Sequence, residues 1–417
     1  MRLKRSRTGS SCRTTRALCC PSSSTKTSAK RVKEVVHDPA ERIRTLRLLM
    51  GLTQGELAQA AGVSQPMISQ IQKGTKGVTD ELLGRIAEAT GTPRSFFDVD
   101  PTDLPTDTLL FRKKASASVR EVGRVEVTVR EAYRVAARLL TETRVRRTTL
   151  PRPEGEISPD AIEDLASATR NALGIAQDGV LGHVIRSCER AGIPVVPLVL
   201  VDAQGHGEDI VVGHSGVSCW RGQSEPSLIS YFSAGSGDRQ RFTVAHELGH
   251  LVLHPARRAE LSPKEAELEA HRFAGALLLP RMRADEAFSG PLMLRDFAAL
   301  KKRWGMSIQA LIQRAYDLGY VDSERKESLY KQIGARGWRT SEPVAVHPEQ
   351  PSLMRAMLAR RYGEPPAVLQ ASEDLGIHPV LMRSLAPESA ANPAAKHGAN
   401  VISLGERRQR VARLKAL

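Results

Sequence analysis

The chain has 417 residues and a formal net charge of +15, with 61 lysines and arginines against 46 acidic residues. This length allows two to three domains with buried cores, and the excess of positive charge favours an anionic partner, most simply nucleic acid. The five cysteines form no C-x-x-C pair, and no apolar run approaches the length of a membrane span. These features argue against a disulfide-rich secreted protein and against a membrane protein, so we expect a cytoplasmic chain.

The first 36 residues are rich in serine, threonine, arginine and lysine and contain no continuous apolar segment. A secretory signal needs such a segment, so we interpret this stretch as a disordered basic tail. A flexible arm that touches DNA is the alternative interpretation.

Residues 37–100 show the pattern of a compact unit of four short helices. Four stretches each combine an apolar stripe with a glycine at or near the end: DPAERIRTLRLLMG, TQGELAQAAGVS, SQPMISQIQKG and TDELLGRIAEATG. Thr53, Ser64 and Thr79 stand where N-caps are needed. Gly62 stands where the turn between the second and third helices needs a positive φ.

The second and third helices of this unit have the spacing of a helix-turn-helix. With Ile68 and Ile71 buried, the third helix presents an outward face whose polar side chains could reach base edges in the major groove. Gln54 begins the preceding helix and could meet a phosphate, while Lys73 could add a contact to the DNA backbone. A helical bundle that contacts only proteins is the alternative.

This segment resembles the Cro/C1-type (XRE) helix-turn-helix family. The matching residues are Thr53, Gln54, Glu56, Leu57, Ala58, Gly62, Val63, Ser64, Ile68, Ser69, Lys73 and Gly74. Gln72 departs from the pattern, because the family often has Glu there. The resemblance implies binding to double-stranded DNA as a homodimer on a two-fold site. The residues expected to contact DNA are Gln54, Ser64, Gln65, Pro66, Ser69, Gln70 and Lys73.

Residues 101–178 are expected to form a linker and a helical region that includes the arginine-rich amphipathic stretch VREVGRVEVTVREAYRVAARLL. Residues 179–322 begin with the expected helix VLGHVIRSCERAG and continue with the candidate strands IPVVPLVLV, DIVVGHSG, VSCW and SLISYFS. We expect Trp220 and Tyr231 to pack this sheet. Residues 323–417 form a helical C-terminal region of unknown role, which ends in a candidate basic helix. The expected fold class is therefore mainly α with a small β-sheet (α+β).

The stretch RFTVAHELGHLVLH, residues 241–254, holds an H-E-x-x-H pattern. Residues four apart lie on one face of a helix, so His246 and His250 can both direct an imidazole at one metal ion. Glu247 then points beside the metal, where a general base for water must lie. A hydrolytic zinc site has three protein ligands and keeps one position open, so the pattern needs a third ligand.

A helix further along the chain, EAELEAHRFAGALLLP, offers candidates for that ligand. Its buried stripe is expected to consist of Ala270, Phe273, Ala274 and Leu277. Glu269 lies at the edge of this stripe and could face a neighbouring helix, whereas Glu265 and Glu267 are more easily interpreted as solvated charges. His254 would have turned by about 80° from His246, so we place it at the surface or behind the ligands.

Together the two stretches resemble the ImmA/IrrE metallopeptidase family. That family combines an H-E-x-x-H helix with a second helix of the form E-A-[N/D]-x-F-A-x-x-L-L-x-P. The resemblance implies a zincin-like metalloendopeptidase domain at 179–322 that binds one Zn²⁺ ion. Its ligands would be His246, His250 and Glu269, and Glu247 would be the catalytic base.

One residue beside the expected centre departs from the family pattern. His271 stands where Asn or Asp is common, so a polar contact made from this position would be altered. A structural zinc site and a metal-free helical core are the alternatives to a catalytic centre.

A DNA-binding unit and a peptidase on one chain indicate gene control by proteolysis. We expect a DNA-binding transcription regulator whose zinc endopeptidase cleaves a repressor or another protein partner in a stress or mobile-element response. One alternative is a DNA-binding regulator whose zinc domain is not catalytic. Another is a component of a toxin–antitoxin-like pair.

Overall fold

The computed structural model describes residues 38–388 except for short gaps. The residues that it leaves out within this range are 103, 105–118, 156, 203, 205, 209–215, 221, 223–224, 233–234, 256 and 258–260. Three expectations therefore lie outside the described residues: the disordered tail, most of the strand DIVVGHSG and the basic C-terminal helix. Every helix in the described ranges is too short or too polar to cross a lipid bilayer.

Four helices and a 3-10 turn form the N-terminal part of the fold. Their bounds are α1 Pro39–Leu49, α2 Gln54–Ala61, α3 Gln65–Gln72, α4 Asp80–Thr90 and η1 Arg94–Asp98. Thr53 caps α2 in a reciprocal capping box, Thr79 caps α4, and Gly62 ends α2 with a φ of 63°, which confirms these caps and the turn. Ser64 begins α3, but its side chain makes no capping hydrogen bond.

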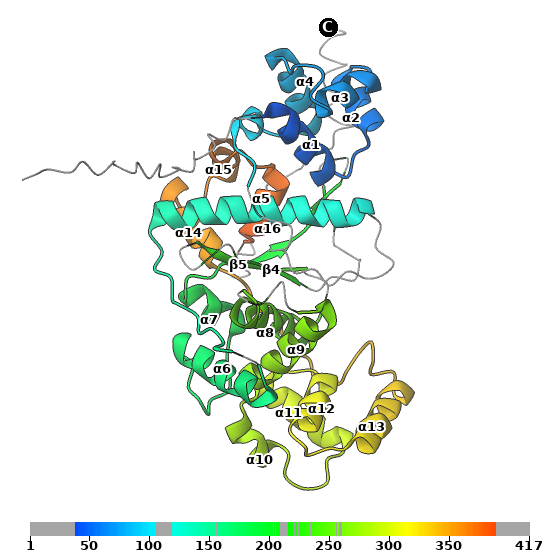
Figure 1. Ribbon diagram of the computed structural model, residues 1–417, viewed down its shortest axis with the longest axis vertical. Coiled ribbons are helices and arrows are strands. Elements are labelled where there is room, and N and C mark those ends of the chain that lie inside the picture. Colours follow the sequence, from blue (N-terminus) through cyan, green and yellow to red (C-terminus); the bar gives the residue numbers. More distant parts are fainter. Residues whose placement is uncertain are drawn as a thin grey trace, which may run out of the picture. The chain divides into compact units, whose positions relative to one another are not determined.

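A long helix, α5 (Val119–Thr143), packs against α1 (Figure 1). Arg42 of α1 donates to both carboxylate oxygens of Glu131 in α5, at 2.6 and 3.1 Å, and both side chains are buried. Arg134 donates to the same carboxylate at 2.8 Å and to the carbonyl oxygen of Leu375 at 2.7 Å. The arginine-rich face of α5 is therefore a packing surface for the C-terminal part of the chain.

A small mixed sheet follows two further helices. The bounds are α6 Pro159–Ala172, α7 Val184–Arg190, β1 Val195–Leu198, β2 Leu200–Val201, β3 Gly207–Glu208, β4 Gly216–Trp220 and β5 Ser227–Phe232. β5 pairs parallel with β1 and antiparallel with β4, while β2 pairs with β3. Val196 and Leu228 lie in the core shared with the N-terminal helices and α5. Their neighbours Val195 and Ile229 lie in the core beneath α8 (Gly237–Leu253), so the sheet separates two cores.

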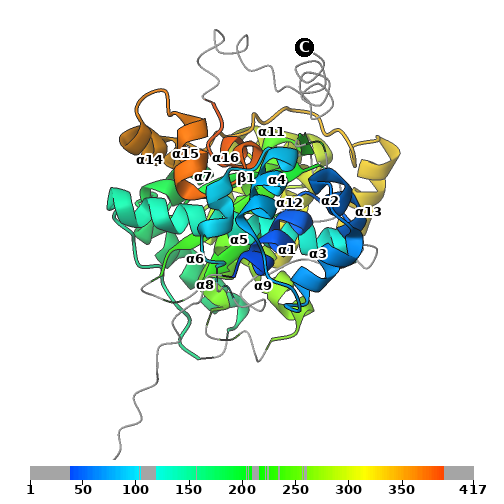
Figure 2. The same cartoon turned by 90° about the horizontal axis from the view of Figure 1, so that it is seen from above.

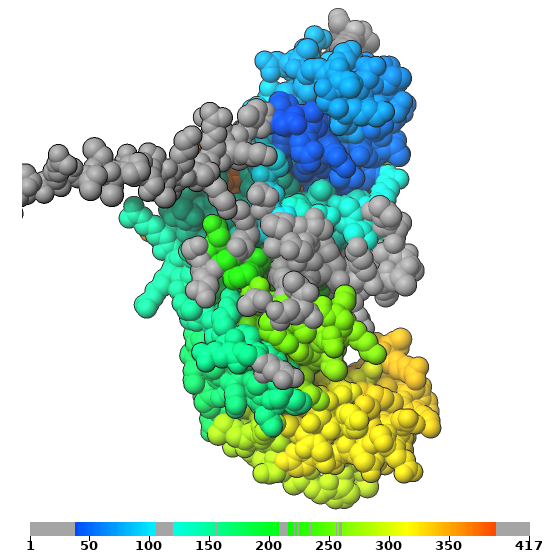
Figure 3. Space-filling view, viewed as in Figure 1, coloured from blue at the N-terminus to red at the C-terminus, as the bar shows by residue number. Residues whose placement is uncertain are grey.

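The remaining helices enclose α8 and return to the N-terminal part. Their bounds are α9 Pro263–Leu278, η3 Arg281–Arg283, α10 Ala284–Ala287, α11 Leu294–Trp304, α12 Ile308–Asp317, α13 Ser323–Ala335, α14 Leu353–Tyr362, α15 Val368–Leu375 and α16 Pro379–Leu385. α8 lies on β4 and β5, and α9 packs on α8 (Figure 1). α6 packs along α9, and the space-filling view shows their surfaces side by side (Figure 3). α14, α15 and α16 follow one another and contact α5, η1 and β1 respectively (Figure 2). The mainly helical fold with a small sheet confirms the expected fold class.

Two buried ion-pair networks hold the N-terminal half of α8. The Nζ atom of Lys301 in α11 lies 2.9 Å from carboxylate oxygens of both Asp238 and Glu342. Arg241 of α8 pairs with Glu349 and donates to backbone carbonyl oxygens before α7. Buried charges are stable when they are paired and hydrogen-bonded in this way. The segment between the two glutamates therefore fixes the helix that carries the H-E-x-x-H pattern.

Candidate metal centre and nucleic-acid interface

The H-E-x-x-H residues lie in the buried middle of α8. His246, Glu247 and His250 expose 8%, 4% and 2% of their surface. The sheet covers one side of α8 and α9 another, and Gly249 permits the second contact. A Cβ atom at Gly249 would stand 2.9 Å from the ring of Phe273 in α9, so a larger residue would push the two helices apart. This close approach brings the polar residues of α9 next to the histidines.

Three side chains from α8 and α9 converge on one point. The Nε2 atoms of His246 and His250 lie 3.0 Å apart. Carboxylate oxygens of Glu267 lie 3.5 Å from the first of these nitrogens and 3.6 Å from the second. Across the described ranges, these residues form the one group of three or more histidine, cysteine or acidic side chains with ligand atoms within 4.8 Å of one another.

The three side chains fit a zinc ion. A tetrahedral zinc site with bonds of about 2.0–2.1 Å sets its ligand atoms about 3.3–3.4 Å apart. The observed separations of 3.0, 3.5 and 3.6 Å bracket that distance. Oε2 of Glu267 is buried and has no hydrogen-bond partner in the described part of the chain, a cost that a cation would remove. Two imidazoles and a carboxylate are also a common donor set for zinc.

Glu269, the expected third ligand, lies in a different place. Its Oε2 atom is 3.1 Å from Nε2 of His254 and 3.1 Å from a terminal nitrogen of Arg257. His254 ends α8, is only 1% exposed, and has its Nδ1 atom 2.8 Å from Nδ1 of His250. The structure thus brings Glu267 to the two histidines in place of Glu269, and it places His254 behind His250.

The buried stripe of α9 explains why the sequence did not separate the two glutamates. At about 100° per residue, Glu267 and Glu269 fall on opposite flanks of the stripe, each about 70–90° from its centre. By periodicity alone, the two glutamates are therefore nearly equally able to face a neighbouring helix. The packing of α9 on α8 decides between them, and no signal within the α9 sequence alone could have identified Glu267.

Glu247 lies beside the convergent side chains, on the side of β4. Burial raises the pKa of its carboxyl group. Its Oε2 atom is buried and makes no hydrogen bond to the residues that the structure describes. Gly216 leaves room for this carboxylate, because a Cβ atom there would stand 2.8 Å from Cγ and 2.9 Å from Oε1 of Glu247. A carboxylate with an unused oxygen in dry surroundings can accept a proton from water.

His271 lies at the exposed edge of the same cluster. It follows Glu267 by one helical turn, and its ring centroid is 4.8 Å from that of His246 in an edge-to-face contact. Its centroid is also 5.2 Å from the ring centroid of Phe242. The residue that departs from the family pattern therefore contacts one of the candidate ligands directly.

The expected DNA-contacting residues of α3 share one face. Gln65, Pro66 and Gln70 are exposed, Ser69 is half-buried, and Lys73 is exposed at the end of the helix. At 100° per residue these five positions span an arc of about 140°, opposite the two buried isoleucines of α3. Ser64 is exposed at the start of the helix. This face has the length and polarity to enter a major groove.

A chain of three glutamines fixes the geometry of that face. Gln65 Nε2 donates to Gln54 Oε1 at 3.0 Å, and Gln54 Nε2 donates to Gln72 Oε1 at 2.9 Å. The start of α2 is thereby joined to both ends of α3. Gln72, which departs from the family pattern, supports Gln54 and was not among the expected site residues. The glutamine spacing in the sequence did not predict this contact, because it depends on how the two helices cross.

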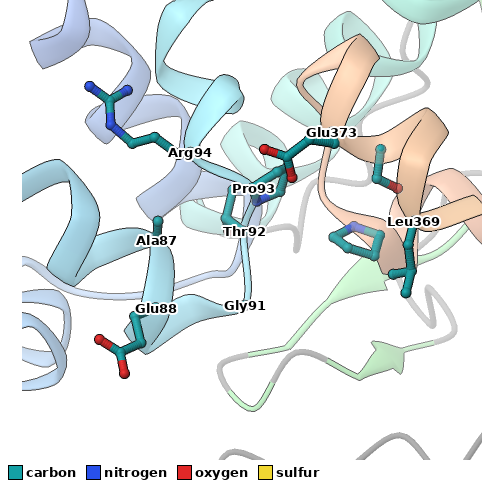
Figure 4. Close-up of a pocket in the computed structure, with 10 residues that line it drawn as sticks. Ala87, Glu88, Gly91, Thr92, Pro93, Arg94, Leu369 and Glu373 are labelled. Carbon is teal, nitrogen blue, oxygen red and sulfur yellow. The ribbon is translucent and has the colours of Figure 1, made fainter.

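A separate pocket of about 440 Å³ lies between α4–η1 and α15–α16 (Figure 4). It is lined by Ala87, Glu88, Gly91, Thr92, Pro93, Arg94, Leu369, Ser372, Glu373 and Pro379. Its charged groups are two carboxylates and one guanidinium, and its lining includes no histidine or cysteine. None of its lining residues belongs to the cluster on α8 and α9, so the pocket is distinct from that cluster.

Comparison with protein families gives two matches. Residues 43–97 match the helix-turn-helix family model, and residues 188–316 match the model of a peptidase family described as the IrrE N-terminal-like domain. A comparison with curated proteins gave no match. The first family indicates DNA-binding regulation, and the second indicates a metallopeptidase-like domain. The chain therefore joins a Cro/C1-type helix-turn-helix domain to an IrrE N-terminal-like metallopeptidase domain.

Proposed function

We propose that this chain is a cytoplasmic DNA-binding transcription regulator whose zinc-dependent endopeptidase domain cleaves a repressor or another protein partner in a stress or mobile-element response. The observation that carries this proposal is the convergence of His246, His250 and Glu267, with the buried Glu247 beside them. In this proposal Glu267 takes the ligand role that the sequence suggested for Glu269.

The roles of the residues follow from their positions. His246, His250 and Glu267 would hold one zinc ion, which when bound supplies Lewis-acid activation of water and of a peptide carbonyl. Glu247 accepts the proton of the attacking water and passes it to the leaving amine. The sheet and α9 limit the access of other water.

The helix-turn-helix residues supply the DNA-binding half of the proposal. The exposed face of α3 would enter the major groove, and the glutamine chain would hold Gln65 ready to contact a base. Gln54 and Lys73 would contact phosphates at either side of this face. A homodimer would place two such helices on the halves of a two-fold site.

The proposal is tested by comparing protein N-termini in host cells that express the wild type, Glu247→Gln or Asp164→Asn. Glu247 is not placed among the metal-holding groups, so its replacement should keep zinc and reduce proteolysis by about 10²- to 10⁴-fold. Asp164 is an exposed carboxylate on α6 and serves as the matched control. New cleavage ends that appear with the wild type and with Asp164→Asn, but not with Glu247→Gln, would support the proposal and identify the substrate.

The opposite result has a defined meaning. If all three proteins contain zinc and leave identical sets of N-termini, with and without stress, the chain is not an endopeptidase under the conditions in which it acts. The zinc domain would then be a sensor or a dimerisation platform for a DNA-binding regulator. The zinc content of the three proteins, purified from the same cells, distinguishes a protein that holds zinc without cleaving a substrate from one that has no zinc.

A further inference from the structure

We propose that His254 and Glu269 position the ligand His250 through a hydrogen-bond chain that keeps the His250 Nε2 lone pair directed at the metal. The inference rests on the proposed function, because it requires zinc at the α8–α9 cluster. It gives a role to two side chains that would not bind the ion themselves: His254, which contacts the proposed ligand His250, and Glu269, which contacts His254.

The hydrogen-bond chain is continuous from Glu269 in α9 through His254 at the end of α8 to His250. Arg257 and His254 both lie 3.1 Å from the same oxygen of Glu269. The other nitrogen of His254, Nδ1, lies 2.8 Å from Nδ1 of His250. The side chains of His254 and His250 are 1% and 2% exposed, so water does not compete for these contacts. The hydrogen bond from Arg257 holds in place the Glu269 oxygen that accepts a hydrogen bond from His254.

The direction of each hydrogen bond follows from the donor capacity of each group. A carboxylate can only accept, so the Nε2 atom of His254 carries the proton that faces Glu269. A neutral imidazole has one N–H group, which leaves Nδ1 of His254 as an acceptor. Nδ1 of His250 must therefore donate to it, and Nε2 of His250 keeps its lone pair. That Nε2 atom is the one that faces His246 and Glu267.

The two histidines of the cluster differ in this respect. Nδ1 of His246 is buried and has no hydrogen-bond partner within the described ranges. The ring of His246 is held instead by edge-to-face contacts with His250 and His271. Because ligand orientation and basicity depend on such outer partners, we infer that metal affinity is set more by the support of His250 than by that of His246.

The test measures zinc affinity of the full-length protein by competition with a chelator for the variants His254→Leu and His254→Asn. Leucine fills the buried space but cannot accept a hydrogen bond. Asparagine carries an amide oxygen close to the position of the histidine Nδ1 and can still accept from His250. We expect His254→Leu to weaken zinc binding by about 10- to 100-fold and His254→Asn to weaken it by less than about 10-fold. His206→Leu, at a histidine between β2 and β3 whose side chain is 45% exposed, is the control.

A second pair of variants tests Glu269, the hydrogen-bond partner of His254, in case His254→Leu does not fold. Glu269→Gln keeps an acceptor for His254, and Glu269→Leu removes it, so zinc affinity should fall further in the second variant. The visible absorption spectrum of the Co²⁺-substituted protein reports the ligand geometry, and it should change in the two leucine variants only. A general loss of packing would not be rescued by asparagine at 254 or by glutamine at 269.

Each outcome decides the matter. A wild type that binds no zinc overturns the proposed function. A wild type that binds zinc, with His254→Leu equal to it in affinity and spectrum, overturns the hydrogen-bond chain alone. The same holds if His254→Asn is as weak as His254→Leu, because the acceptor at this position would then have no effect.

Discussion

In the helix-turn-helix domain the side chains proposed to meet the ligand are exposed, whereas in the α8–α9 centre they are buried. Gln65 and Gln70 stand on the outer face of α3, opposite the isoleucines that hold the helix. His246 and His250 are enclosed by the sheet on one side and by α9 on the other. A DNA-reading face can be inferred from a single helix, because it is the side opposite the buried apolar stripe. A buried centre requires the relative position of two helices, which one sequence does not state.

The largest effect that sharpens this comparison is expected at Glu267. Glu267→Ala removes one of three proposed ligands. Loss of an outer hydrogen-bond partner weakens metal binding by up to about 100-fold, so loss of this ligand should weaken zinc binding by more than that. Zinc content and affinity of the purified full-length protein measure this effect. Glu269→Gln, which keeps an acceptor for His254, should retain one zinc ion per chain.

The reverse ranking would break the assignment. If Glu269→Gln lost its zinc while Glu267→Ala kept it, α9 would turn its other flank toward the histidines when the ion is bound. Asp164→Asn controls for the loss of a carboxylate elsewhere on the surface. Comparable zinc loss in both glutamate variants would indicate that α9 as a whole had moved.

The next effect concerns a buried ion pair that joins α1 of the helix-turn-helix domain to α5. Glu131 lies between Arg42 of α1 and Arg134 of α5, and Glu131→Gln leaves these guanidinium groups without their charged partner. Breaking a buried ion pair in this way costs about 3–5 kcal/mol, so the free energy of unfolding should fall by that amount at pH 7. Urea unfolding of the wild type and the variant measures the difference.

The pH dependence gives this prediction a second readout. Burial raises the pKa of Glu131, but Arg134 and Arg42 outweigh that effect and lower the pKa from 4.5 to about 2. A lowered pKa means that the stabilisation is complete above about pH 4.5 and is lost as the pH falls toward 2. The advantage of the wild type over Glu131→Gln should shrink in that window. Asp80→Asn, at an exposed carboxylate that pairs with Arg94, should change stability little at any pH.

The helices were more predictable than the contacts between them. Thr53 and Thr79 cap their helices as expected, because a cap is decided within four residues of sequence. The pattern of α8 likewise needed only the spacing of residues four apart. By contrast, η1 was not expected, since its five residues carry no period and it exists because Phe96 and Phe97 are buried in the core.

The same distinction applies inside the candidate centre. The sequence predicts that His246, Glu247 and His250 lie close together because they belong to one helix. The sequence of α9 indicates a solvated charge at Glu267, because its histidine partners lie on another helix and only packing brings them near. For His254 the helical period allows either a surface position or a position behind the ligands. Its burial depends on α9, whose Glu269 covers the end of α8.

The smallest expected effects lie on the exposed face of α3, where the comparison can be tested without disturbing a core. Duplex sequences selected by the wild-type protein from a random pool provide the DNA. Gln65→Ala should weaken binding to the selected sequence by about 1–3 kcal/mol and relax the preference at one base position, because a glutamine reads one base edge. Binding is measured for the selected duplex and for its single-base variants at fixed salt.

Lys73→Ala provides the contrast within the same helix. A phosphate contact is independent of sequence, so this variant should weaken binding to every duplex nearly equally and reduce the salt dependence by about one released ion. If Gln65→Ala behaved in the same way, with the base preference unchanged, the glutamine chain from Gln72 through Gln54 would be holding a phosphate contact. The reading of bases would then belong to Ser69 or Gln70, whose side chains stand on the same face but outside that chain.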